Sequence, residues 1–246
     1  MATSILITGS NRGIGKELLR KYLDLPNKIV ISGVRDIQHE TTNSIRALPV
    51  ASGSRHIIVK IDSDSLTDAE AAAEELRSQY GVTKLDTIIA NAGIGKFARI
   101  DQTPISAYVD QMKTNALGPV VLYLAMRSLL LESAKPRFVV ISTVLGSIGL
   151  QAERPIPDAG YGMSKAAVNF FVSKLHHEES AVTAFPIHPG WVQTPLGNDI
   201  AKVIGMKEAA ITEEQSAAGV FEQIEKSTRE ADSGKFIDLN GAPIPW

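Results

Sequence analysis

The stretch Thr8-Gly9-Ser10-Asn11-Arg12-Gly13-Ile14-Gly15 joins an apolar run, Ser4–Thr8, to a segment with helical spacing, Lys16–Leu25. Glycine lets such a turn tighten and lets backbone N–H groups approach a pyrophosphate, which would then face the N-terminus of the helix. Glycines alone are equally compatible with a plain turn, but here they lie between a predicted strand and a predicted helix. The stretch therefore predicts a dinucleotide-binding loop at the start of an α/β fold.

The rest of the chain repeats the alternation of strand and helix. Helical spacing covers Ser65–Tyr80, a region from Thr103 through Leu131, Tyr161–Glu178 and a segment capped by Thr212 and Gln215. This pattern predicts a single-domain α/β Rossmann fold over residues 1–246, with a doubly wound parallel sheet of about seven strands. The further apolar, β-rich runs are Lys28–Val34, His56–Ile61, Leu85–Ala90, Arg137–Ser142, Val182–His188 and Lys235–Leu239.

Two stretches without an obvious pattern, Gly146–Gly160 and Thr194–Ile211, each follow a predicted strand. In open α/β sheets ligands bind beyond the carboxyl ends of the strands. We therefore expect both stretches to border the ligand site, and we expect a substrate loop at about 195–211.

The composition excludes several classes of function. The 246 residues are 44% hydrophobic and 21% charged, with a formal net charge of −2, so neither a disordered chain nor a polyanion-binding protein is favoured. The chain has no cysteine, which excludes disulfides, thiolate metal sites and a cysteine nucleophile, and its five histidines are scattered. The N-terminal apolar run lacks a preceding basic region, and the apolar stretch from Leu117 to Met126 is too short to span a bilayer. We expect a soluble, cytoplasmic protein with no metal, nucleic-acid or membrane partner.

The spacing of the glycine loop, T-G-x-x-x-G-x-G, resembles that of the short-chain dehydrogenase/reductase family. The resemblance extends over nearly the whole chain through Asn91-Ala92-Gly93, Asn115, the pair Tyr161 and Lys165, and a loop from Pro189 to Thr194. The chain also resembles a carbonyl-reductase-like branch of this family, which includes fungal norsolorinic acid ketoreductases. The cues for this branch are the Leu145–Gly149 run, the Ala184–Thr194 segment and the C-terminal Pro243-Ile244-Pro245-Trp246.

The resemblance implies a set of residues that hold a nicotinamide dinucleotide. Asp62 ends the third predicted strand, where the family has an acid near the adenine. Tyr161 and Lys165 are shared with the catalytic group. The implied cofactor-binding residues are Gly9, Ser10, Asn11, Arg12, Gly13, Ile14, Gly15, Arg35, Asp62, Asn91, Ala92, Gly93, Tyr161, Lys165, Pro189, Gly190, Val192 and Thr194.

Tyr161 and Lys165 are four residues apart on a predicted helix and so share one face. A free tyrosine has a pKa near 10, but a neighbouring ammonium favours the phenolate and lowers that pKa. A tyrosine tuned in this way can donate a proton to a carbonyl oxygen while the cofactor supplies a hydride. We therefore expect Tyr161 to be the proton donor, and Lys165 to lower its pKa and to hold the ribose hydroxyls.

The family has a serine that orients the substrate carbonyl, three residues before a glycine. Counting back from Gly146 puts Thr143 in that place, with Ser142 one residue earlier. Neighbouring strand residues face opposite sides, so both cannot point at the site. We favour Thr143 and keep Ser142 as the alternative. Asn115 would complete the catalytic group by holding a water in a proton relay.

The choice of cofactor depends on the end of the second strand. An acid there would hydrogen-bond a ribose 2′-hydroxyl and repel a 2′-phosphate. The family's acid position falls on Val34, followed by Arg35, and Arg12 adds a second cation. Two guanidinium groups suit a phosphate, so we expect NADP(H). Asp36 is the counter-argument, because a register error would put an acid at the ribose.

These expectations combine into an NADPH-dependent ketoreductase that acts on a small carbonyl substrate, such as a polyketide or other secondary metabolite. Two alternatives stay open: a non-redox protein that binds or senses NADP, and a cofactor-assisted isomerase or cyclase. Loops at Gly93–Thr103, Ser147–Gly160 and Pro195–Ile211 would select the substrate, with an insertion at Gln151–Asp158. The resemblance also implies a homodimer or homotetramer formed through the helices that carry Asn115 and Tyr161.

Overall fold

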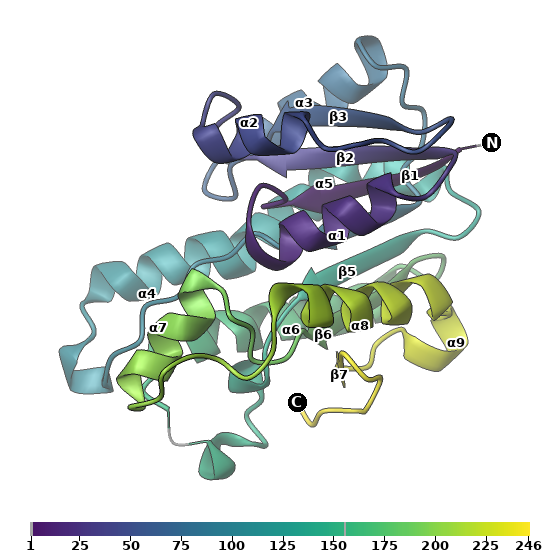
Figure 1. Ribbon diagram of the computed structural model, residues 1–246. Helices are drawn as coiled ribbons and strands as arrows, with labels where there is room; N and C mark the ends of the chain where they lie inside the picture. The colour runs from purple at the N-terminus through teal and green to yellow at the C-terminus, as the bar shows by residue number, and fades with distance from the viewer. Residues whose placement is uncertain (1, 155) are drawn as a thin grey trace.

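The computed structural model describes residues 2–154 and 156–246, and seven strands form its sheet. All pairings are parallel, in the order β3-β2-β1-β4-β5-β6-β7 (Figure 1). This confirms the predicted fold class, and each predicted run matches a strand to within two residues at either end. The strands are β1 (Thr3–Thr8), β2 (Lys28–Val34), β3 (Arg55–Lys60), β4 (Thr87–Ala90), β5 (Arg137–Ile141), β6 (Thr183–His188) and β7 (Ile237–Asp238).

Helices cover both faces of the sheet because strand residues alternate between two apolar clusters. Ile5 and Ile7 of β1 pack toward α1 (Gly13–Leu23), α2 (Glu40–Arg46) and α8 (Glu213–Lys226). Leu6 between them packs on the opposite side, toward α3 (Asp68–Ser78), α5 (Gly118–Leu131) and α6 (Ala159–Glu178). A strand buried on both faces is a continuous run of apolar residues in the sequence. The strands could therefore be recognised from the sequence.

The strand order reverses between β1 and β4, which are neighbours in the sheet but far apart in the chain. The chain leaves β1 toward β2 and β3, and then returns to β4 and continues outward to β7. Such a switch point opens a crevice beyond the carboxyl ends of the two central strands. The glycine loop follows β1, and Asn91 follows β4, so both predicted motifs lie at this crevice.

The helical region predicted from Thr103 to Leu131 begins with α4 (Ile105–Gln111), passes through a π-helical turn η2 (Met112–Leu117) and ends with α5. By length and composition Ile105–Leu131 could cross a membrane, but 56% of its most apolar window is buried inside the protein. Leu122, Met126 and Leu130 pack against the sheet. Core packing therefore accounts for the apolar character of this helix.

Four sequence expectations need correction. The stretch Thr194–Ile211 is not irregular, because α7 occupies Pro195–Val203; Thr194 accepts a hydrogen bond from Gly197 N, and Pro195 is at the first helical position. The helix α3 begins at Asp68 rather than Ser65, although Ser65 Oγ still accepts from Asp68 N. The stretch Gly146–Gly160 contains a 3-10 turn, η4 (Gln151–Glu153), and η3 (Val144–Gly146) precedes it. The helices α2 and α9 (Arg229–Asp232) had no predicted counterpart.

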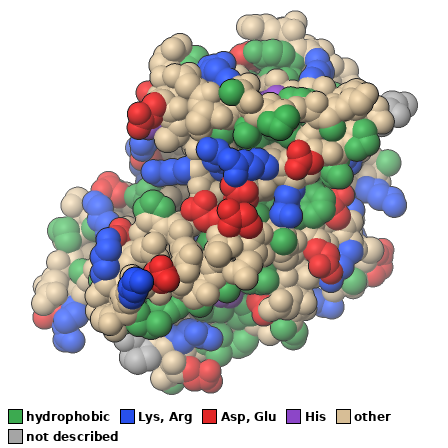
Figure 2. Space-filling model, in the orientation of Figure 1, with side chains coloured by type: hydrophobic (Ala, Val, Ile, Leu, Met, Phe, Trp, Pro, Cys, Tyr) green, Lys and Arg blue, Asp and Glu red, His purple; other side chains and the backbone are tan. Residues whose placement is uncertain are grey.

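Charged side chains are mixed on the face seen in Figure 2. Lys and Arg gather over α1, directly above a group of Asp and Glu at the start of α8. The helix α1 contains Lys16 and Arg20, and α8 begins with Glu213 and Glu214. The two groups influence each other, since Lys16 and Arg20 oppose the rise in the pKa of Glu213 that burial causes. This face therefore has no extended field of a single sign.

Candidate active site

A cleft of about 640 Å³ runs along the carboxyl edge of the sheet. Loops that follow β1 to β6 line it, together with α7. Of the predicted site residues, Ser10, Gly15 and Asn115 lie behind its surface. The predicted residues on its wall are Gly9, Asn11, Arg12, Gly13, Ile14, Arg35, Asp62, Asn91, Ala92, Gly93, Thr143, Tyr161, Lys165, Pro189, Gly190, Val192 and Thr194.

The glycine loop fits tightly against the end of β4. A Cβ atom on Gly15 would lie 2.4 Å from the carbonyl oxygen of Gly9, so only glycine lets α1 begin so close to β1. Asn91 Nδ2 donates to the carbonyl oxygens of Thr8 and Gly9, at 2.9 and 3.2 Å. Ser10 Oγ is buried and has no hydrogen-bond partner among the described residues. A fixed loop with an unused buried hydroxyl fits a dinucleotide whose phosphates lie at the N-terminus of α1.

The two arginines that we expect to bind a 2′-phosphate lie in the part of the cleft near the glycine loop and the end of β2. Arg12 and Arg35 are exposed on the cleft wall, and neither forms an ion pair within residues 2–154 and 156–246. Strand β2 ends at Val34, as the predicted register requires. The carboxylate of Asp36 accepts a hydrogen bond from Gln38 N at 2.8 Å and so stabilises the turn that follows β2. The arrangement suits a 2′-phosphate better than a free ribose hydroxyl.

Sequence reasoning missed two residues beside these cations. His39 and Thr41 line the same part of the cleft from the start of α2. Thr41 Oγ1 accepts from Asn11 Nδ2 at 2.7 Å, which ties α2 to the glycine loop. The N-cap of α2 is His39, whose side chain accepts from Thr41 N. Histidine is not one of the usual N-cap residues, so the sequence offered no ordinary signal for the start of α2.

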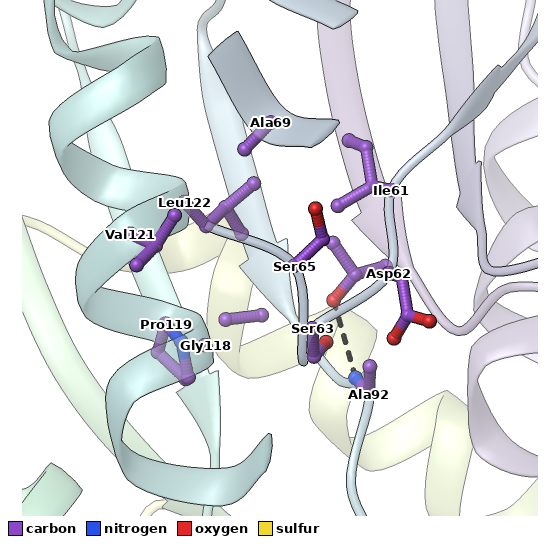
Figure 3. A pocket seen from close by; sticks show the side chains of 12 residues that line it. Ile61, Asp62, Ser63, Ser65, Ala69, Ala92, Gly118, Pro119, Val121 and Leu122 are labelled. Atoms are coloured by element: carbon purple, nitrogen blue, oxygen red, sulfur yellow. Dashed lines mark hydrogen bonds between the residues drawn. The ribbon is translucent and has the colours of Figure 1, made fainter. Parts of the chain in front are cut away.

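Asp62 follows β3 and borders both the cleft and a small cavity of about 10 Å³ beside it. Figure 3 shows Gly118, Pro119 and Leu122 of α5 on one side of that cavity, with the Asp62 carboxylate pointing away from them. A Cβ on Gly118 would lie 2.9 Å from Ser63, so α5 packs directly on this loop. The packing holds Asp62 at the cleft wall, where the predicted adenine contact would be made.

Tyr161 and Lys165 both lie on the face of α6 that meets the cleft, and both are buried. Lys165 Nζ donates to the carbonyl oxygen of Ile141 at 2.8 Å and lies 5.8 Å from the centroid of the Tyr161 ring. Phe97 packs edge-on against the same ring at 5.3 Å. The tyrosine hydroxyl forms no hydrogen bond with any residue that the structure describes, so it is available to a ligand.

The pKa values of this pair differ from the sequence expectation. Burial, and then the negative charge of Asp158, raise the pKa of Tyr161 above its ordinary value. We expected a lower value through Lys165. Burial also lowers the pKa of Lys165, to about 8, and its ammonium points to the Ile141 carbonyl. The expectation was wrong because it counted the charge of the lysine and left out the loss of water around the phenol.

Ser142 and Thr143 turn to different partners at the end of β5. Ser142 Oγ donates to Asn169 Oδ1 of α6 at 2.6 Å, which uses its proton within the protein. Thr143 Oγ1 accepts from Leu145 N at 3.3 Å and keeps its own proton free. A free hydroxyl proton on the cleft wall is what a substrate carbonyl requires. The geometry therefore favours Thr143 over Ser142.

Asn115 lies in the π-helical turn η2, and its side chain is held on both sides. Its Oδ1 accepts from Ile94 N at 2.9 Å, and its Nδ2 donates to Ile94 O at 2.8 Å and to Ser164 Oγ at 3.0 Å. A Cβ on Gly93 would lie 3.2 Å from Asn115 Oδ1 and 3.6 Å from Lys165 Nζ, so the two side chains converge there. The water-holding role of Asn115 stays a prediction.

The other half of the cleft is mostly apolar. Trp191 is fixed by a hydrogen bond from its Nε1 to Gly197 O at 2.9 Å, and α7 contributes further aliphatic side chains. Of the predicted insertion Gln151–Asp158, Arg154 and Ile156 reach the wall, and Pro155 lies outside the described residues. No group of three or more histidine or acidic side chains in the described residues could hold a metal. The apolar wall residues here include Val144, Leu145, Ile156, Trp191, Leu196, Ile200 and Ile204.

Comparison with known proteins gives the family. The family model described as short chain dehydrogenase matches residues 3–204. A norsolorinic acid ketoreductase of Aspergillus parasiticus is 38% identical over 248 residues, which cover 99% of this chain and 91% of the relative. Short-chain dehydrogenase RED3 of Pyricularia oryzae is 38% identical over 250 residues, which cover 100% of this chain and 99% of the relative.

A solved structure agrees with these relatives. An NADPH-bound carbonyl reductase from chicken fatty liver superposes with a TM-score of 0.86 at 25% identity, over 100% of this chain and 99% of the other. The chain therefore belongs to the short-chain dehydrogenase/reductase family of NAD(P)(H)-dependent oxidoreductases.

Proposed function

We propose that this protein is an NADPH-dependent ketoreductase that reduces the carbonyl group of a small, largely apolar substrate to an alcohol. The observation that carries the proposal is the convergence of Thr143, Tyr161 and Lys165 on one cleft wall. The ketoreductase and carbonyl reductase names of the relatives support this reaction class. The substrate class that we propose is a polyketide or other secondary metabolite, in line with the resemblance to norsolorinic acid ketoreductases.

Each side chain has a part in the proposed reaction. The Thr143 hydroxyl donates to the substrate carbonyl oxygen and orients it toward Tyr161. The phenol of Tyr161 gives its proton to that oxygen as the carbonyl is reduced. NADPH, when bound, supplies the hydride. Lys165 binds the ribose hydroxyls from the same helix face, where its hydrogen bond to Ile141 O holds the side chain in place.

The preference for NADPH rests on Arg12 and Arg35. A direct test is a fluorescence titration of the purified protein with NADPH and, in parallel, NADH. Tighter binding of NADPH is expected. Tighter binding of NADH would mean that Asp36, not Arg35, meets the ribose. No binding of either cofactor would contradict the ketoreductase proposal and favour a protein that has lost the redox reaction.

We also propose a homodimer or homotetramer built on α5 and α6. Exposed apolar side chains lie on both helices: Leu124 on α5 is 65% exposed, and Phe170 on α6 is 70% exposed. Large exposed apolar side chains on these two helices support a subunit interface there. Light scattering after size exclusion should give a multiple of 26.4 kDa, and the double change Leu124→Glu, Phe170→Glu should give the monomer. The cytosol is the compartment that we propose.

A further inference from the structure

The ring of Phe97 packs directly against the ring of Tyr161. The two centroids are 5.3 Å apart and the ring planes meet at 73°, which is an edge-to-face pair. Such pairs are attractive because the positive edge of one ring meets the negative face of the other. The described residues of the cleft wall do not include Phe97, so this ring meets Tyr161 from behind the wall.

Packing sets the direction of the Tyr161 phenol. Its hydroxyl has no hydrogen bond with any residue that the structure describes, and rotation of a tyrosine ring about its own bond is only weakly restricted without neighbours. Tyr161 belongs to a small apolar cluster with Leu145 of η3 and Ile200 of α7, and Phe97 packs against this cluster. Phe97 is therefore the aromatic neighbour in a set of contacts that fixes the ring.

The backbone on both sides of Phe97 is tied to neighbouring elements. Lys96 N donates to Gln111 Oε1 at 2.9 Å, and Gln111, the last residue of α4, is fully buried. On the other side, Ala98 pairs with Asp158, the residue immediately before α6. The segment that carries Phe97 is thus joined to α4 and to the start of the helix that carries Tyr161.

The Phe97 ring itself has little free space. A Cβ on Gly95 would lie 2.7 Å from Phe97 Cζ and 3.2 Å from Leu196 Cδ1 of α7. The ring therefore occupies space that is left by the missing side chain of Gly95, with α7 close by. A side chain packed this closely moves little, so it can act as a fixed support for the ring beside it.

We propose that Phe97 is a positioning residue for ketone reduction, which holds the Tyr161 ring so that its hydroxyl faces the substrate carbonyl. The inference rests on the proposed ketoreductase function. In reduction, the carbonyl carbon gains a hydride from the cofactor, the carbonyl oxygen gains the phenolic proton, and solvent later returns a proton to the tyrosinate. A displacement of about 1 Å at such a site can cost about 10²-fold in rate. Loss of Phe97 should therefore reduce turnover rather than cofactor binding.

The kinetic test changes the support and leaves the proton donor. Phe97→Leu removes the ring but keeps an apolar side chain, and Phe97→Ala removes most of the side chain. The expected losses in kcat are about tenfold and up to about 100-fold, with the Kd for NADPH unchanged. Phe221→Ala is the matched control, since Phe221 pairs edge-on with Tyr22 at 5.0 Å away from the cleft. It should lose stability and keep its kcat. An unchanged kcat in both Phe97 variants would overturn the proposal.

A double variant shows whether Phe97 acts through Tyr161. Adding Phe97→Leu to Tyr161→Phe should not lower the residual turnover further, because the proton that the support positions is already absent. A merely structural role would reduce turnover by the same factor in both backgrounds. That result would overturn the proposal.

A spectroscopic test does not depend on turnover. The protein is labelled with fluorotyrosine, and the Tyr161 resonance is identified by its loss in Tyr161→Phe. Fluorine NMR should give a narrow Tyr161 resonance in the wild type and a broadened or split one in Phe97→Leu, because the ring then samples more than one orientation. An unchanged line width would overturn the proposal. A broadened line in a protein that reduces no ketone would instead overturn the ketoreductase function.

Discussion

The two halves of the cleft are built in different ways. The cofactor half consists of strand ends and the glycine loop, whose backbone is fixed by short polar side chains such as Asn91 and Thr8. The substrate half consists of η3, the segment at Arg154 and Ile156, Trp191 and α7, which bring mostly apolar side chains to the cleft. Every member of the family must bind a similar dinucleotide, so the cofactor-binding residues follow shared motifs. Substrates differ between members, and so do the residues that bind them. The first half could therefore be identified by motif, and the second could not.

The largest effect, a loss of turnover, is expected on changing Tyr161, which lies where the two halves of the cleft meet. Tyr161→Phe removes the proton donor and leaves the ring, so turnover should fall by about 10²- to 10⁴-fold while NADPH affinity changes little. Ketone-dependent oxidation of NADPH measures turnover, and fluorescence titration measures binding. Tyr80→Phe, which removes a hydroxyl outside the cleft, is the control. Turnover retained in Tyr161→Phe would exclude the assigned role.

The next largest effect should come from the tight packing of the cofactor half. In Gly15→Ala the new methyl group would lie 2.4 Å from Gly9 O and 2.5 Å from Asn91 Nδ2. The strain should lower the free energy of unfolding by about 1 to 3 kcal/mol and weaken NADPH binding. Urea denaturation measures the first quantity. Lys16→Ala, at the next helix position, should leave both unchanged. A fully stable Gly15→Ala protein would show that the loop is more adaptable than its geometry indicates.

A smaller effect is expected on the preference of the protein for NADPH over NADH. Arg35→Ala should weaken NADPH binding about 10- to 150-fold and leave NADH binding nearly unchanged, because a guanidinium bound to a phosphate contributes about 1.5 to 3 kcal/mol. Arg12→Ala should act in the same direction. Arg55→Ala changes an exposed arginine at the opposite end of the strands and serves as the control. Equal losses for NADPH and NADH would place Arg35 away from the 2′-phosphate.

The smallest effect should lie in the substrate half. Ile204→Ala removes an apolar wall residue just after α7, and Val203→Ala changes its neighbour, which does not line the cleft. The first should raise KM for a bulky ketone a few-fold and should leave NADPH affinity unchanged. Ile204 is 40% exposed, so it contributes less than the about 1 to 3 kcal/mol of a fully enclosed apolar contact. The second should change neither. An effect on NADPH affinity instead would show that the two halves are coupled.

The sheet and the cofactor loops could be predicted because their signals are local. Strands buried on both faces are continuous apolar runs, and the glycine spacing between β1 and α1 needs no distant partner. The helix α7 was missed although Thr194 and Pro195 are ordinary start signals, because no long apolar periodicity follows them. The raised pKa of Tyr161 could not be predicted, since it depends on burial and on the packing of Asp158 beside α6. Likewise, the partners of Asn115 become visible only when η2 meets the segment at Ile94.

Above all, we propose that a hydride reaches a substrate carbonyl in this cleft while Tyr161 provides the proton. The most direct measurement uses NADPH deuterated at the transferable position of the nicotinamide, with an apolar aromatic ketone as substrate. Mass spectrometry should find one deuterium on the carbinol carbon of the alcohol, in equal amount to the NADPH consumed. Loss of ketone without NADPH consumption, or an alcohol without deuterium, would contradict the claim and favour an isomerase, a cyclase or a non-redox binding protein.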